Sequence, residues 1–98
     1  MDRNEYLQLG IFGIAEDKEF HTALGVSTKQ IKRQALAEFI ISKDLSGRAF
    51  ARVVDVSPAT ITKWLYTETQ PSIRVVRRIA TKFGVTVDYV DSLFTATA

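Results

Sequence analysis

The stretch that decides the fold is residues 47–66, GRAFARVVDVSPATITKWLY. It holds two segments with apolar residues at helical spacing, separated by the three residues 55–57. Ser57 is a typical N-cap residue, and Pro58 suits the first helical position because its missing N–H needs no partner there. Ser46 can cap the first segment in the same way. Two short helices joined by three residues predict a helix-turn-helix. Its expected inward side chains are Phe50, Ala51, Val54, Ile61, Trp64 and Leu65.

One further helix is predicted before this pair. Ser27 followed by Gln30 has the form of a capping box, so a helix is expected from about Thr28 to Lys43. Its apolar residues recur at helical spacing, and Asp44 and Leu45 form the turn that follows. The expected inward residues are Ile31, Leu36, Phe39 and Ile40.

Two more helices are predicted after the pair. The polar residues 67–70 and Pro71 form a loop, Ser72 caps the next helix, and Gly84 ends it. Thr86 caps a short last helix, whose first turn contains Asp88. The expected inward residues are Ile73, Val76, Ile79, Ala80 and Phe83 in the first of these helices, and Val87, Val90 and Leu93 in the second. The fold class is therefore all-α, with five helices.

Length and composition exclude several classes of protein. A chain of 98 residues builds one small core and has no room for a second lobe. The absence of cysteine excludes disulfides and thiolate metal sites, and no apolar run is long enough to span a membrane. His21 is the lone histidine, with no metal-binding spacing around it. We expect no enzyme activity, no cofactor, no bound metal, and a cytoplasmic location.

Charge divides the chain into an acidic head and a basic body. Up to Ser27 there are two basic and five acidic residues, a balance of −3, and the remainder has eleven basic and six acidic residues, a balance of +5. Residues 1–27 are therefore treated as an N-terminal extension and residues 28–98 as the helix-turn-helix domain. Residues 7–14 fit a strand or a helix equally well, whereas residues 16–24 favour a helix. We expect the extension to pack on the body or across a dimer.

The body resembles the phage repressor and Cro family, also called the XRE family, over roughly residues 31–94. The resemblance implies an all-α, five-helix lambda-repressor-like domain. The motifs that carry it are Ala51, Val56-Ser57, Ile61, Trp64, Pro71-Ser72, Ile79-Ala80 and the run Phe83-Gly84-Val85-Thr86-Val87-Asp88-Tyr89.

In such a motif the second helix, here about residues 57–66, lies in the major groove of DNA. By analogy with the family, base contacts would come from its outer face. Pro58 and Ala59 offer apolar contact to a thymine methyl group, Thr62 can donate or accept, and Lys63 can donate to guanine. The expected base-contacting residues are Pro58, Ala59, Thr62 and Lys63.

Phosphate contacts are expected from the groups that flank this helix. These are Gly47, Arg48, Arg52, Ser57, Thr60, Thr69 and Gln70, with Lys29, Lys32 and Arg33 added by the first helix. Basic residues Arg74, Arg77, Arg78 and Lys82 in the fourth helix fit a DNA contact or a solvated face.

The chain departs from the family pattern at several positions. Gly47 replaces a glutamine that touches phosphate, so it offers only its backbone N–H, and residues 65–67 replace the family run Glu-Asn-Gly. The family glutamate pairs with an arginine whose position is Ile40 here, and packing of Ile40 on Leu65 would preserve the fold. Glu68 stands where basic residues are common and repels phosphate.

These observations predict a sequence-specific regulator of transcription that binds double-stranded DNA, with repression as the expected role. Two recognition helices about 34 Å apart require a homodimer on a palindromic operator. By resemblance to the family, the dimer surface is the last helix, with Tyr89, Leu93 and Phe94. On DNA the protein would be associated with the nucleoid. The alternative is a protein-interaction module that acts through the extension, such as an antitoxin or the partner of an antirepressor.

Overall fold

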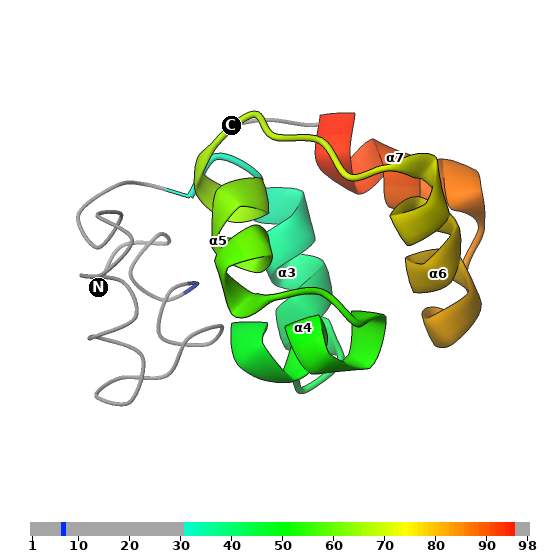
Figure 1. Ribbon diagram of the computed structural model, residues 1–98, viewed down its shortest axis with the longest axis horizontal. Coiled ribbons are helices and arrows are strands. Elements are labelled where there is room, and N and C mark those ends of the chain that lie inside the picture. The colour runs from blue at the N-terminus through cyan, green and yellow to red at the C-terminus, as the bar shows by residue number, and fades with distance from the viewer. Residues whose placement is uncertain (1–6, 8–30, 96–98) are drawn as a thin grey trace.

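The computed structural model describes Leu7 and residues 31–95, and within them it confirms the predicted all-α fold (Figure 1). Residues 31–95 form five helices and no strand. The helices are α3 (Gln34–Ser42), α4 (Gly47–Val54), α5 (Pro58–Tyr66), α6 (Ile73–Phe83) and α7 (Val87–Thr95).

Apart from the start of α3, the helix ends lie where local signals in the sequence placed them. Three serines cap α4, α5 and α6 by accepting a hydrogen bond from the backbone N–H three residues later, at 3.1, 3.2 and 3.3 Å. Gly84 ends α6 with a φ of 66°, a left-handed conformation that glycine adopts at low cost. Thr86 Oγ1 accepts from the N–H of Tyr89 at the start of α7. The confirmed serine caps are Ser46, Ser57 and Ser72.

The predicted start of the first described helix, α3, is wrong. A helix from Thr28 was predicted, but the helix begins at Gln34. The N–H groups of Lys32 and Arg33 donate to the carbonyl of Leu65 at 2.7 and 3.3 Å, so they close the end of α5 instead of starting a longer helix. The capping box at residues 27–30 lies outside the described residues.

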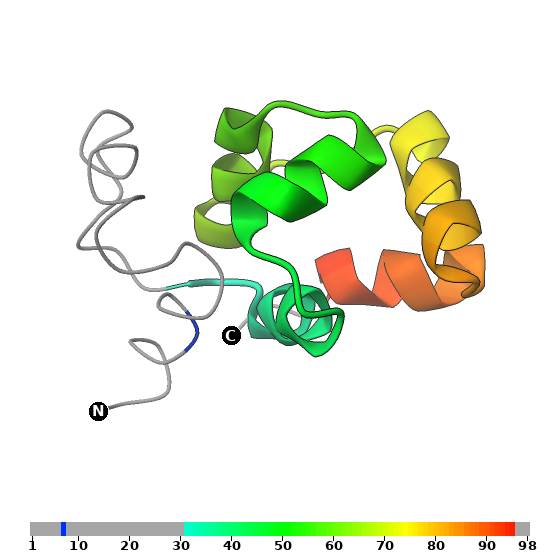
Figure 2. The same cartoon turned by 90° about the horizontal axis from the view of Figure 1, so that it is seen from below.

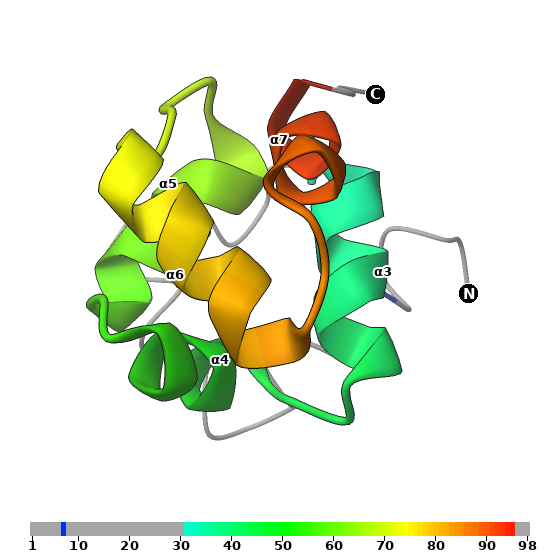
Figure 3. The ribbon, with the colours of Figure 1, turned by 90° about the vertical axis from the view of Figure 1, so that its right-hand side faces the viewer.

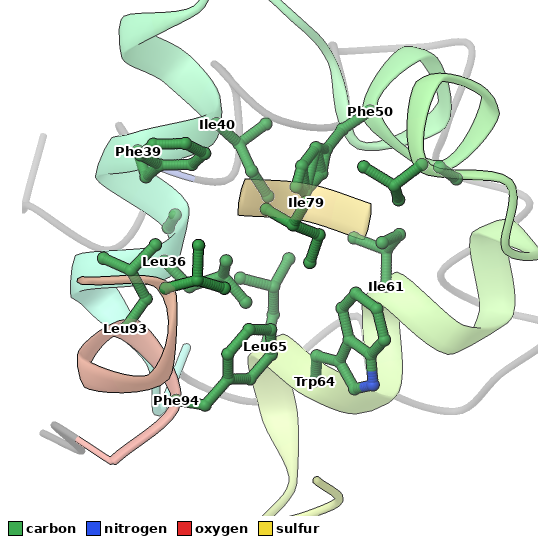
Figure 4. Close-up of a cluster of buried hydrophobic side chains, with 14 of the residues drawn as sticks. Leu36, Phe39, Ile40, Phe50, Ile61, Trp64, Leu65, Ile79, Leu93 and Phe94 are labelled. Carbon is green, nitrogen blue, oxygen red and sulfur yellow. The ribbon is translucent and has the colours of Figure 1, made fainter. Parts of the chain in front are cut away.

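The helices enclose one apolar core (Figure 4). Aromatic side chains from all five helices meet edge-on, such as Trp64 and Phe94, with ring centroids 5.2 Å apart. The predicted inward residues are confirmed except Ile73, the first residue of α6, which is 58% exposed. Phe83 and Val87 are half-buried against the cluster.

The elements are arranged so that the helix-turn-helix pair lies along one side. Helix α4 packs on both α5 and α6 and lies between them in Figure 2. Helices α3 and α7 contact each other on the opposite side, which Figure 3 shows from the direction of α6. Helices α3 and α4 pack on α5, and its Trp64 meets Phe94 of α7, while the exposed Ser57 and Pro58 leave its N-terminal end at the surface.

Of the N-terminal extension, the structure describes Leu7 alone. Leu7 is helical, is 2% exposed and belongs to the same buried cluster as the helical body. The other predictions for residues 1–27, including the helix at 16–24, lie outside the described residues. None of the described helices is long and apolar enough to cross a membrane.

Candidate nucleic-acid interface

The turn between α4 and α5 has a geometry that fixes the two helices relative to each other. Asp55 adopts a left-handed conformation, with φ 60° and ψ 50°. The N–H of Val56 donates to the carbonyl of Ala51 at 2.9 Å, and that of Asp55 donates to the carbonyl of Arg52 at 3.3 Å. These two bonds form a Schellman motif, and aspartate is one of the residues that tolerate the left-handed region. The small Ala51 is fully buried here, as the close approach of the helices requires.

An arginine from α6 strengthens the same turn. Arg78 Nη1 donates to the carbonyls of Val54 at 2.9 Å and Asp55 at 3.3 Å. The negative end of the α4 dipole stabilises a cation at this place. Arg78 therefore binds the main chain of the turn. For this residue, the interpretation of the basic α6 side chains as a solvated face does not hold.

Helix α5 presents only part of its predicted base-reading face to solvent. Pro58 and Lys63 are exposed and Ala59 is half-buried. Thr62 is 1% exposed, and its hydroxyl donates to the carbonyl of Pro58 at 3.3 Å. The prediction that Thr62 lies on the outer face is therefore wrong, because position 62 turns toward the protein on this helix.

The start of α5 is a suitable place for an anion. Ser57 is exposed, and its Oγ accepts from the N–H of Thr60. Thr60 Oγ1 lies 2.9 Å from Ser57 Oγ, and either hydroxyl can donate. Backbone N–H groups at a helix N-terminus and two hydroxyls are groups that bind phosphate oxygens.

The flanking residues predicted to touch phosphate divide into exposed and buried groups. Arg48 and Arg52 lie on the exposed side of α4, one turn apart, and no acidic residue is present in that helix. Thr69 and Gln70 are exposed in the loop before α6, where Glu68 is exposed as well. Gly47 is buried, so its main chain has little surface to offer to a phosphate.

The prediction that Arg33 contacts phosphate is also wrong. Its side chain is 0% exposed and donates to main-chain carbonyls, so it cannot reach DNA. Burial lowers the pKa of Arg33, and the carboxylate of Glu68 opposes that shift. The sequence spacing indicates this burial, since Arg33 precedes the buried Leu36, Ala37 and Ile40 by three, four and seven residues. Lys32 is exposed, and Lys29 lies outside the described residues.

Of the positions that depart from the family pattern, four are buried and two are not. Ile40, Gly47, Leu65 and Tyr66 are buried, whereas Thr67 is half-buried and Glu68 is exposed. Ile40 and Leu65 are both fully buried and belong to the same cluster, in place of an ion pair. Tyr66 is buried as well, and burial raises the pKa of its hydroxyl above the usual range. An apolar pair of this kind keeps the end of α5 on the body without the desolvation cost of two charges.

The predicted dimer residues do not share one surface. Tyr89 is 46% exposed, whereas Leu93 and Phe94 are 5% and 1% exposed and pack inside the protomer. Their prediction as contact residues is corrected, because their side chains already belong to the core. Tyr89 borders a pocket of about 500 Å³ between α3 and α7. The other lining residues are Ala35, Glu38, Phe39, Ser42, Ser92 and Leu93.

The described residues contain no cluster of histidine, aspartate or glutamate side chains that could hold a metal ion. His21 lies outside them.

Comparison with known proteins identifies the family. A family model described as helix-turn-helix matches residues 36–90, more than half of the chain, and includes α4, α5 and the turn between them. No curated protein and no solved structure matches. The match covers the Schellman turn and the buried Ala51 described above, which are the features that fix a recognition helix. The chain therefore belongs to the helix-turn-helix family of the phage repressor and Cro type, and is a DNA-binding regulator with the lambda-repressor-like all-α fold.

Proposed function

We propose that the protein is a sequence-specific repressor that binds a palindromic operator as a homodimer, with α5 in the major groove. The observation that carries this proposal is the way the turn presents α5. The Schellman turn and Arg78 fix the start of the helix, and Pro58 at its first position and Lys63 in its last turn remain exposed. Repression follows if the bound dimer covers DNA that RNA polymerase needs.

In this proposal α5 contacts the bases and α4 contacts the DNA backbone. Lys63 donates to guanine O6 and N7, while Pro58 and Ala59 give apolar contact to thymine methyl groups. Arg48 and Arg52 on α4 neutralise phosphates on the flanking backbone, and their contacts carry no sequence information. Further phosphate contacts come from Ser57, Thr60, Thr69 and Gln70, all of which reach the surface.

Selection from a randomised duplex library at low salt tests the proposal. We expect enrichment of a palindrome whose half-sites are about one helical turn apart. If about four phosphates are neutralised per subunit, the slope of log affinity against log salt should be near −4 per subunit. If no sequence is enriched even at low salt, the proposal fails and a protein-interaction role acting through the extension gains support.

Two substitutions separate base reading from phosphate contact. Lys63→Ala should change the preferred base at one position of each half-site and cost about 1–3 kcal/mol on the original operator. Arg48→Ala should weaken all duplexes alike and reduce the salt slope by about one. Both effects are measured by fluorescence anisotropy on the selected operator and its single-base variants.

Lys82→Ala is the matched control, since Lys82 is exposed in the last turn of α6 and its loss changes net charge equally. Equal effects of Lys63→Ala and Arg48→Ala on every duplex would show that Lys63 contacts only phosphate.

A further inference from the structure

The segment that precedes α3 closes the C-terminal end of the recognition helix. The backbone N–H groups of Lys32 and Arg33 donate to the carbonyl of Leu65, and Arg33 Nη1 donates to the carbonyl of Trp64 at 2.7 Å. The preceding carbonyl, of Lys63, accepts from the N–H of Thr67 at 2.9 Å. Three of the final carbonyls of α5 are thus satisfied, two of them by residues about thirty positions earlier in the chain.

The Arg33 side chain also reaches two other parts of the molecule. Its Nη1 donates to the carbonyls of Thr67 at 3.0 Å and Thr69 at 2.8 Å, in the loop after α5. Its Nε donates to the carbonyl of Phe94 at 3.0 Å, in the last turn of α7, and its Cζ lies 5.4 Å from the centre of the Phe94 ring. One guanidinium therefore joins the ends of two helices, whose dipoles both favour a cation there.

This arrangement is costly if stability is its sole purpose. Arg33 is 0% exposed, and its Nη2 has no hydrogen-bond acceptor within the described part of the chain. A buried charge loses its hydration, and apolar side chains of similar volume often give equal or greater stability. What an apolar residue cannot do is hold carbonyls of α5, its following loop and α7 at fixed positions.

We propose that Arg33 is a positioning residue that couples the recognition helix to the dimer helix and thereby sets the spacing of the two half-sites. The inference rests on the proposed function, in which α5 reads DNA within a homodimer, and on the expectation that α7, with the exposed Tyr89, forms the dimer surface. Because each α5 is tied to its own α7, the distance and angle between the two recognition helices follow from the α7 contact. Without the tie, α5 keeps its base-reading side chains but tilts more freely against its partner.

The test compares operators that have identical half-sites and differ by one base pair in spacing. Arg33→Lys keeps the cation but loses the planar fork, and Arg33→Met loses both. We expect both variants to keep the half-site sequence, while their preference for the wild-type spacing falls about tenfold, the size of a typical coupling between sites. Val90→Ala on α7 is the control, since Val90 is fully buried and its truncation lowers stability without touching these carbonyls.

All proteins are measured at a temperature at which thermal melts show them folded. If the Arg33 variants, once folded, retain the wild-type spacing preference, Arg33 is structural only and the inference is overturned. The same holds if Val90→Ala relaxes spacing as much as they do. If the wild-type protein selects no sequence at all, the proposed function fails first, and that outcome is recognisable before any variant is made.

A measurement on the wild-type protein covers the case in which the Arg33 variants do not fold. By NMR, the Arg33 Nε–H should exchange with solvent about as slowly as the backbone N–H of the fully buried Ile79, because the tie opens only when the domain unfolds. Exchange of Arg33 Nε–H that is 100-fold faster or more, in the free protein and in its operator complex, would show a loose side chain and overturn the proposal.

Discussion

At the scale of single residues, Tyr66 gives a dependence of stability on pH. Burial raises the pKa of its hydroxyl, so the folded protein holds this proton more tightly than the unfolded chain, whose tyrosines ionise near pH 10. The contribution is complete below about pH 10 and is lost as the pH rises toward the higher pKa of the folded state. Above pH 10 the free energy of unfolding of the wild type should therefore fall, relative to Tyr66→Phe, by about 1.4 kcal/mol per pH unit.

Urea unfolding of both proteins between pH 8 and 11.5 measures this difference, because the ionisation of lysines affects both alike. Tyr89→Phe is the matched control, since it removes the hydroxyl of a tyrosine that is 46% exposed in place of the buried one. Parallel curves for the wild type and Tyr66→Phe would mean that the Tyr66 hydroxyl ionises equally well in the folded protein.

At the scale of elements, two serine caps with the same geometry separate stability from DNA contact. Ser57 and Ser72 each accept from the N–H three residues later, at 3.2 and 3.3 Å, at the starts of α5 and α6. Either serine-to-alanine change should lower the free energy of unfolding by about 1 kcal/mol. Ser57→Ala should in addition weaken binding to every duplex about tenfold, since it removes a hydrogen bond to a charged phosphate.

Thermal melts and binding to the selected operator measure the two effects. Because Ser72→Ala has the same stability cost and lies away from α5, its affinity should equal that of the wild type. If Ser57→Ala and Ser72→Ala bind operator equally well, Ser57 caps the helix and does nothing more.

The elements also show which parts of the fold a sequence can predict. The caps Ser46, Ser57 and Ser72 depend on neighbours within three residues, so local patterns predicted them. The start of α3 depends on the carbonyl of Leu65, more than thirty residues away, and no local pattern contains that partner. For Arg33, local spacing indicates burial but not its acceptors, which lie in α5, α7 and the loop between α5 and α6.

Site residues were predicted correctly where helix geometry alone decides whether a side chain faces solvent or the core. Lys63 and Arg52 were placed on exposed faces, and both are exposed. Thr62 was wrongly predicted to be exposed because threonine suits either a surface or a buried position. Its buried hydroxyl finds a partner by donating to the carbonyl of Pro58. Leu93 was predicted both as an inward residue, which is confirmed, and as a dimer contact, which its burial corrects together with that of Phe94. A short terminal helix has apolar residues for its own core and for a partner, and sequence does not separate the two.

At the scale of the whole molecule, a net charge of +2 hides an uneven distribution of charge along the chain. The balance of +5 after residue 27 includes the exposed Arg48, Arg52 and Lys63 of α4 and α5, whereas the extension carries the −3. Leu7 nevertheless lies in the core of the basic body. One residue of the acidic extension, Leu7, is thus part of the core of the DNA-binding domain.

Dimerisation is the property of the whole molecule on which operator recognition depends. Two large apolar side chains with high exposure are Tyr89 on α7 and Ile73 on α6. A two-fold interface places the same residue of both protomers near the axis, so a new carboxylate there repels its own copy and loses apolar burial. Tyr89→Asp should raise the dimer dissociation constant about 10- to 100-fold, or 1.4–2.8 kcal/mol.

Ile73→Asp introduces the same charge in place of another large exposed apolar side chain, so it controls for the added charge. Sedimentation equilibrium without DNA measures the dissociation constants, and binding to a single half-site shows whether α5 is intact. Tyr89→Asp should retain the half-site affinity and lose the gain from a second half-site, because each protomer still folds and reads DNA. A wild-type dimer in Tyr89→Asp, or its loss in Ile73→Asp, would place the two-fold interface away from α7.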